Sequence, residues 1–119
     1  MADYPLQNLA WSADKRKRLQ IHLNVLDDLK VALNKPGKRH TNMSRRVAAI
    51  AAQVVPPLTQ AYRSEDGLAV QRVLDGASQQ LQALKDELHE EAARDADLHR
   101  DAELFVDEIE KLQGTLQHG

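Results

Sequence analysis

The pattern of apolar and polar positions follows helical spacing through most of the chain. Residues 1–11 have no clear period and are expected to form an N-terminal arm. Ser12 is placed to cap a first helix over residues 13–34, whose apolar stripe is wide enough to contact more than one neighbour. Pro36 and Gly37 predict a loop directly after this helix.

A second helix is expected to begin near Thr41, Asn42 or Ser44, which compete as its cap. This helix is rich in alanine, whose small side chain allows close packing against a neighbouring helix. The proline pair at positions 56–57 predicts an end at about Val54, because a residue before proline is displaced from helical geometry.

The strongest pattern is a heptad repeat in the C-terminal half. Ser64 is the expected cap of this segment, and all a and d positions from Val70 to Leu116 are apolar except Glu91 and Asp95. Such a seam is typical of a helix that packs against other helices, so its apolar residues are candidates for a protein interface. These candidates are Leu74, Leu81, Leu84, Leu88, Leu98, Phe105, Ile109 and Leu112.

Glu91 and Asp95 occupy adjacent layers of the seam and leave two interpretations open. One is a single helix of about 48 residues, about 70 Å long, which would need a partner to cover it. The other is a hairpin that turns at Ala92–Asp97 and completes a compact four-helix bundle. Because this segment lacks glycine, proline and asparagine, its composition slightly favours the continuous helix.

The expected fold class is therefore all-α, with two antiparallel helices packed on a long heptad-patterned helix or on a helical hairpin. The sequence predicts a single domain over residues 1–119. It consists of the arm (1–11), a basic helix pair (12–63) and an acidic coiled-coil-like region (64–119).

Composition narrows the function classes. The chain has no cysteine, which excludes disulfides, zinc–thiolate sites and thiol nucleophiles. It has no apolar run near the length needed to cross a bilayer, and we expect no membrane partner. Its N-terminus does not resemble a signal peptide, so a cytoplasmic location is expected.

The net charge of −2 conceals a strong asymmetry along the chain. Residues 1–63 carry 11 Lys and Arg against 4 Asp and Glu, whereas residues 64–119 carry 5 against 14. Such asymmetry indicates either a nucleic-acid or basic contact surface, or two halves that pack together and neutralise each other.

Two basic clusters are the candidate nucleic-acid site. One lies at the start of the first helix and the other around the start of the second, where a helix N-terminus favours anions. If the two helices are antiparallel, the clusters lie at opposite ends, roughly 30 Å apart. The second helix has few base-reading side chains, so the phosphate backbone is the expected target. The candidate residues are Lys15, Arg16, Lys17, Arg18, Lys35, Lys38, Arg39, His40, Arg45 and Arg46.

Metal and catalytic sites are poorly supported by the sequence. Glu91, Asp95, His99 and Glu103 lie four residues apart along one face of a continuous helix, but a di-iron bundle needs ligand pairs from further helices. His22 lies on the apolar face of the first helix and is expected to be a structural histidine. No histidine is paired with a recognisable nucleophile, so we expect no enzyme, no metal and no cofactor.

These observations predict a non-enzymatic helical subunit that binds the nucleic-acid backbone through its basic clusters, within a larger nucleoprotein assembly. The alternative is a protein-interaction module, such as an adaptor, chaperone or inhibitor, that acts through the acidic heptad helix. Under either hypothesis the heptad seam is expected to bind a protein partner or a second copy of the chain.

Overall fold

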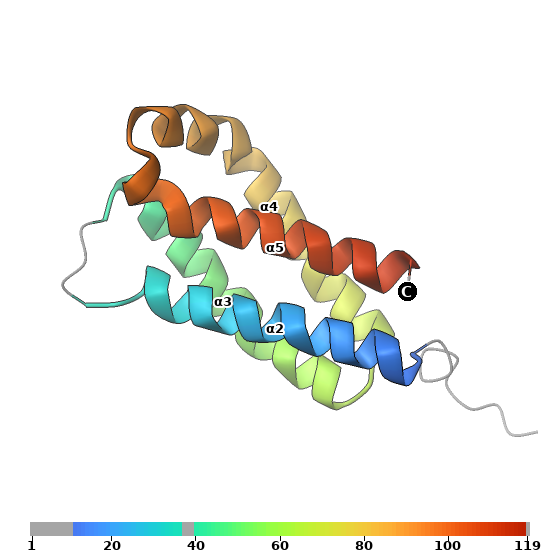
Figure 1. The fold of residues 1–119 in the computed structure, drawn as a ribbon. Helices are drawn as coiled ribbons and strands as arrows, with labels where there is room; N and C mark the ends of the chain where they lie inside the picture. Colours follow the sequence, from blue (N-terminus) through green and yellow to red (C-terminus); the bar gives the residue numbers. More distant parts are fainter. Residues whose placement is uncertain (1–10, 37–39, 119) are drawn as a thin grey trace, which may run out of the picture.

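The structure is a computed structural model that describes residues 11–36 and 40–118. In this part of the chain the regular elements are the helices α2 (Ala13–Leu33), α3 (Asn42–Arg63), α4 (Gly67–Arg94) and α5 (Ala96–His118). They form a compact bundle in which helices that follow one another along the chain are antiparallel (Figure 1). The all-α prediction is therefore confirmed. None of the described helices is long and apolar enough to cross a membrane.

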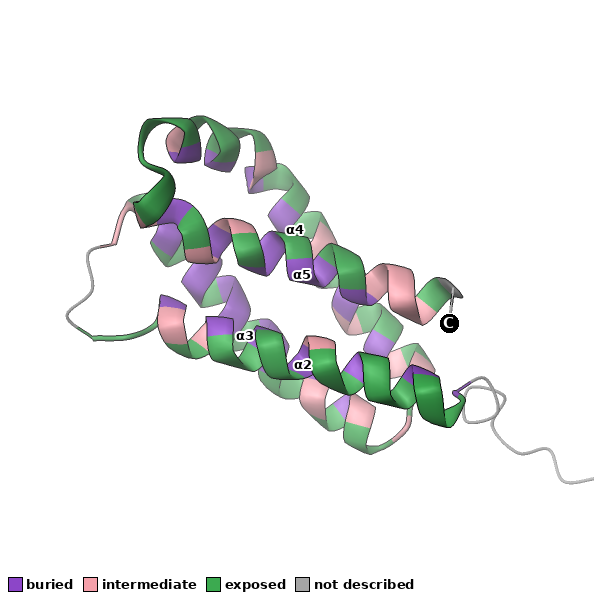
Figure 2. Cartoon of the chain, viewed as in Figure 1, coloured by how far each residue is buried: buried purple, intermediate pink, exposed green. Residues whose placement is uncertain are grey.

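Each helix packs against two main neighbours. Helix α2 contacts α3 and α5, and α4 contacts the same two helices from the other side of the bundle. The shared core is built mainly from leucine, valine and alanine, with Phe105 completely buried at its centre. The buried faces point inward and the exposed faces outward along all four helices (Figure 2).

The C-terminal half is a hairpin, so the slight preference for one continuous helix was wrong. Helix α4 ends at Arg94, and α5 begins at Ala96. Between them Asp95 leaves helical geometry, with φ −149° and ψ 86°. Its carboxylate accepts a hydrogen bond from the amide of Leu98 at 3.1 Å. An aspartate cap at one position thus supplies the turn for which the composition gave no glycine, proline or asparagine.

Helix α3 also differs from expectation, because it continues through Pro56 and Pro57 to Arg63. A proline has no amide hydrogen, so the carbonyls of Ala52 and Gln53 lose their helical partners. These four residues are all exposed, which lets water hydrate the two carbonyls. On the opposite face, burial of the apolar side chains before and after the prolines holds the helix together.

The predicted cap of the first helix is confirmed, the second cap is one of the three competing candidates, and the third prediction was wrong. Ser12 caps α2 by accepting from the amide of Lys15, and Thr41 caps α3 by accepting from the amide of Ser44. Ser64, expected to cap the next helix, is instead the C-cap of α3. Asp66 caps α4 through a 3.0 Å hydrogen bond from the amide of Ala69.

Candidate nucleic-acid interface

The first basic cluster, Lys15 to Arg18, lies at the N-terminal end of α2, beside the C-terminal end of α5. Lys15 is only 5% exposed, and its ammonium donates a 2.7 Å hydrogen bond to the carbonyl of Leu116. Burial, and secondarily the charge of Arg18, lowers the pKa of the Lys15 ammonium below 10.5. Lys15 therefore satisfies one of the unpaired carbonyls at the end of α5 and is not available to a ligand.

Two further side chains of this cluster are paired within the chain. Arg16 forms an ion pair with Glu65, and Arg18 pairs with Asp14 at 3.2 Å. The Arg16 carbonyl also accepts a 3.0 Å hydrogen bond from Tyr62, whose ring stacks on Trp11. Only Lys17 is exposed without a carboxylate partner among the described residues. Lys15 and Arg16 thus connect the start of α2 to other parts of the bundle, and Lys17 and Arg18 do not.

The second cluster, Lys35 to Arg46, lies at the opposite end of the bundle, as the antiparallel prediction required. Lys38 and Arg39 lie outside the described residues. Lys35 and Arg45 are exposed, His40 is half-buried, and neither Lys35 nor Arg45 pairs with a carboxylate in the described chain. Arg46 contacts Glu87 of α4 at 3.6 Å, with both side chains more than half exposed.

The start of α3 provides fewer free amides than a helix N-terminus usually does. Thr41 and Ser44 form a capping box: the Thr41 hydroxyl accepts from the Ser44 amide at 3.0 Å, and the Ser44 hydroxyl accepts from the Thr41 amide at 2.8 Å. Two donors that could hold an anion are therefore already satisfied. Side-chain charge from Lys35, Arg45 and Arg46 is what remains for a phosphate at this end.

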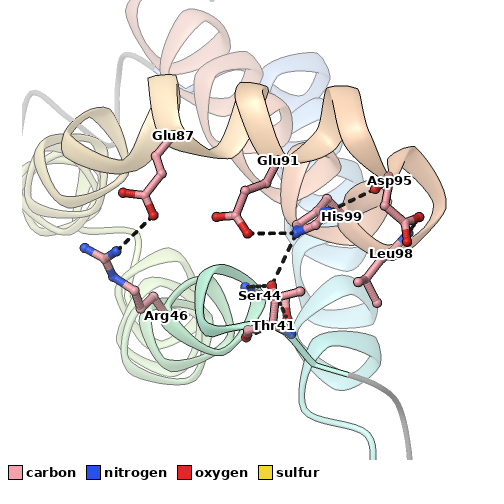
Figure 3. A network of polar contacts seen from close by, with 8 residues as sticks. All are labelled: Thr41, Ser44, Arg46, Glu87, Glu91, Asp95, Leu98 and His99. Atoms are coloured by element: carbon pink, nitrogen blue, oxygen red, sulfur yellow. Dashed lines mark hydrogen bonds and ion pairs between the residues drawn. The ribbon is translucent and has the colours of Figure 1, made fainter.

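A buried histidine joins this end of α3 to the turn between α4 and α5 (Figure 3). His99 is 3% exposed; its Nδ1 donates to the carbonyl of Asp95 at 2.9 Å. Its Nε2 lies 3.2 Å from the hydroxyl of Thr41 and 3.5 Å from a carboxylate oxygen of Glu91. Because a carbonyl only accepts, Nδ1 carries the proton, and in neutral His99 the Nε2 lone pair accepts from Thr41. His99 thus anchors the α3 cap to the hairpin.

The four residues expected along one face of a continuous helix are separated by the turn at Asp95; they are Glu91, Asp95, His99 and Glu103. Glu91 and His99 face each other across this turn, and Glu103 pairs instead with His89 at 3.1 Å. Among the described residues no group of three or more carboxylates and histidines is placed to hold a metal ion.

A second polar group, not anticipated from the sequence, links α2 to α5. His22 lies between Glu108, 2.5 Å from Nδ1, and the hydroxyl of Thr115, 3.0 Å from Nε2. Glu108 is 8% exposed, and His22 is half-buried, as its position on the apolar face predicted. The order hydroxyl, imidazole, carboxylate is that of a catalytic triad. However, Glu108 and Thr115 lie within one helix, whose backbone amides are used internally and offer no oxyanion hole. The group connects α2 to α5.

The residues of the heptad seam lie inside the bundle. Leu98 is half-buried, and the other seven candidate interface residues are buried in the core. In the folded chain they pack against α2, α3 and each other, so the surfaces left for a partner are the outer faces of the helices.

The outer face of α3 is a basic surface that the sequence patterns did not single out as a unit. No acidic residue occurs between Asp28 and Glu65, so α3 carries no carboxylate at all. Its exposed face begins with Arg45 and Arg46 and ends with Arg63, about 27 Å further along the helix. Between the arginines the exposed residues are small or neutral: Ala49, Ala52, Gln53, Pro56, Pro57 and Gln60. The interval without acidic residues is the signal in the sequence that, together with the extension of α3 to Arg63, identifies this face.

Comparison of the chain with models of protein families, with curated protein sequences and with solved structures found no match. Function is therefore inferred from the residues of this chain alone.

Proposed function

We propose that this chain is a non-enzymatic helical protein that binds the phosphate backbone of nucleic acid along the outer face of α3. The supporting observation is that this face carries arginine at both ends and no carboxylate over its whole length. Phosphate contacts of this kind give affinity without reading sequence, and the small side chains between the arginines let a backbone approach closely.

The distribution of ion pairs makes α3 a better candidate for phosphate binding than the first basic cluster, Lys15 to Arg18. Lys15 is buried, and Arg16 is paired with Glu65 of the same chain, so two of the four cations of that cluster are engaged. At the other end, Lys35 and Arg45 have no such partner among the described residues. The Arg46–Glu87 contact is long and exposed, so it contributes little and does not hold Arg46 away from a phosphate.

The test is a mobility-shift titration against mixed duplex DNA and RNA at two salt concentrations. We expect Arg45→Ala with Arg46→Ala to weaken binding and to reduce the slope of log K against log salt by about 1–2, roughly 0.9 for each phosphate that the variant no longer neutralises. The matched control removes the same charge from exposed positions on α4 and α5, as Arg72→Ala with Arg100→Ala.

Two results would overturn the proposal. One is the absence of salt-sensitive binding by the parent protein at low salt. The other is an equal decrease of affinity in the α3 variant and in the control, which would mean that net charge rather than the α3 face sets the affinity.

A further inference from the structure

The outer face of α2 has no partner in the bundle although its pattern is that of a helix interface. Lys17, Ile21, Asn24, Asp28 and Val31 recur at alternating intervals of four and three residues, and all are exposed. Helix α2 contacts α3 and α5 through its other side, and its outer face is exposed along most of its length (Figure 2). Side chains at this spacing form a line along one face of a helix, and this line can pack against a single neighbouring helix.

Exposed apolar side chains are concentrated on this helix. Ile21 is 54% exposed, Val31 is 59% exposed and Val25 is 36% exposed, whereas the only other large exposed apolar side chains among the described residues are Leu68 and Leu104. Beside Val31 a hollow of about 640 Å³ between α2 and α3 is lined largely by apolar atoms. These features form a surface for contact with another protein.

The charges on this face are complementary to themselves. Lys17 lies before the centre of the face, and Asp28 follows the centre at an equal distance. When two copies of α2 are laid antiparallel with Ile21 opposite Asn24, Lys17 of each copy lies opposite Asp28 of the other. A parallel arrangement would instead bring like charges together. Opposite charges at equal distances from a centre are what a two-fold symmetric interface requires.

These two charged side chains are also available to a partner. Neither Lys17 nor Asp28 has an ion pair among the described residues.

We propose that two copies of this chain associate antiparallel through the outer face of α2. Ile21 lies at the centre of the interface with Val25 beside it, and Lys17 of each copy pairs with Asp28 of the other. One helix pair buries an area at the low end of specific interfaces, so we expect a dissociation constant of about 1–100 µM. The proposal does not depend on nucleic-acid binding, because none of these residues lies on α3.

The first experiment is sedimentation velocity over a concentration series that spans this range. We expect concentration-dependent dimerisation of the parent protein, weakened at least about tenfold by Ile21→Glu. The matched control, Leu104→Glu, introduces the same charge at another exposed apolar position and should leave the constant unchanged. Circular dichroism confirms that both variants keep their helical content.

The second experiment tests the pairing itself. In a variant with Lys17→Glu both charged residues of the contact line are acidic, and in a variant with Asp28→Lys both are basic. We expect each alone to be monomeric and an equimolar mixture to form a heterodimer. A monomeric parent at every concentration, a dimer that Ile21→Glu leaves intact, or a mixture that does not associate would each overturn the proposal.

Discussion

Lys15 differs from the other three residues of its basic cluster because its charge lies inside the bundle. Its ammonium bonds the Leu116 carbonyl, which connects the start of α2 to the end of α5. Sequence alone could not distinguish it from its neighbours, because all four are basic and adjacent. Only the position of α5 decides which of them points inward. At the residue scale, half of a cluster that indicated nucleic acid, Lys15 and Arg16, is therefore engaged within the bundle.

The position of Lys15 predicts a specific dependence of stability on pH. We expect Lys15→Met to lower the free energy of unfolding by about 1 kcal/mol, because it removes the bond to Leu116 while keeping the apolar stem. The pKa of Lys15 in the folded chain lies below 10.5, its value in the unfolded chain. Between these two pKa values the unfolded chain binds more protons, so the stability of the parent protein rises with pH. The Lys15→Met variant lacks this rise.

Urea unfolding at several pH values from neutral to 10.5 measures the difference in the free energy of unfolding between the parent protein and the Lys15→Met variant. This difference should grow as the pH rises through that range. The control is Lys17→Met, at an exposed position, which should show no such trend. A difference that shrinks with rising pH would mean that the folded environment raises the pKa of Lys15 rather than lowering it.

At the scale of elements, the positions and type of the helices could be predicted from apolar spacing, because burial of one face determines them. The two errors arose where a local signal competed with tertiary packing. Pro56 and Pro57 are strong helix breakers, but burial of the apolar residues around them outweighs the two missing hydrogen bonds. Asp95 is only a weak helix breaker, but two hydrogen bonds hold the turn. Its carboxylate accepts from the amide of Leu98, and its carbonyl accepts from His99. The basic α3 face could be foreseen only once α3 was known to extend to Arg63.

The hairpin turn predicts a measurable contribution from a single cap. We expect Asp95→Ala to lower the free energy of unfolding by about 1 kcal/mol, because the Leu98 amide loses its acceptor. The control is Asp75→Ala, which makes the same substitution at an exposed position in the interior of α4. Thermal unfolding of both variants compares them directly, and equal stability of the two would show that the Asp95 cap does not hold the turn.

On the scale of the whole molecule, the opposite charges of the two halves meet at specific points rather than over a broad surface. Arg16 with Glu65 and Arg46 with Glu87 each join the N-terminal half to the C-terminal half. These contacts account for part of the charge asymmetry that the sequence shows. The outer face of α3 keeps its positive charge, and the outer faces of α4 and α5 keep most of the negative charge. The bundle is therefore polarised across its width.

The most direct test of the proposed function is to map the amide chemical shifts of the full-length protein by NMR while a short mixed-sequence duplex is added at low salt. Binding along α3 predicts the largest shifts at Lys35, Arg45, Arg46 and Arg63, and their reversal when salt is raised. Amides on the acidic faces of α4 and α5 should stay unchanged. Shifts confined to α4 and α5, or none at any residue, would contradict the proposal that α3 binds the nucleic-acid backbone.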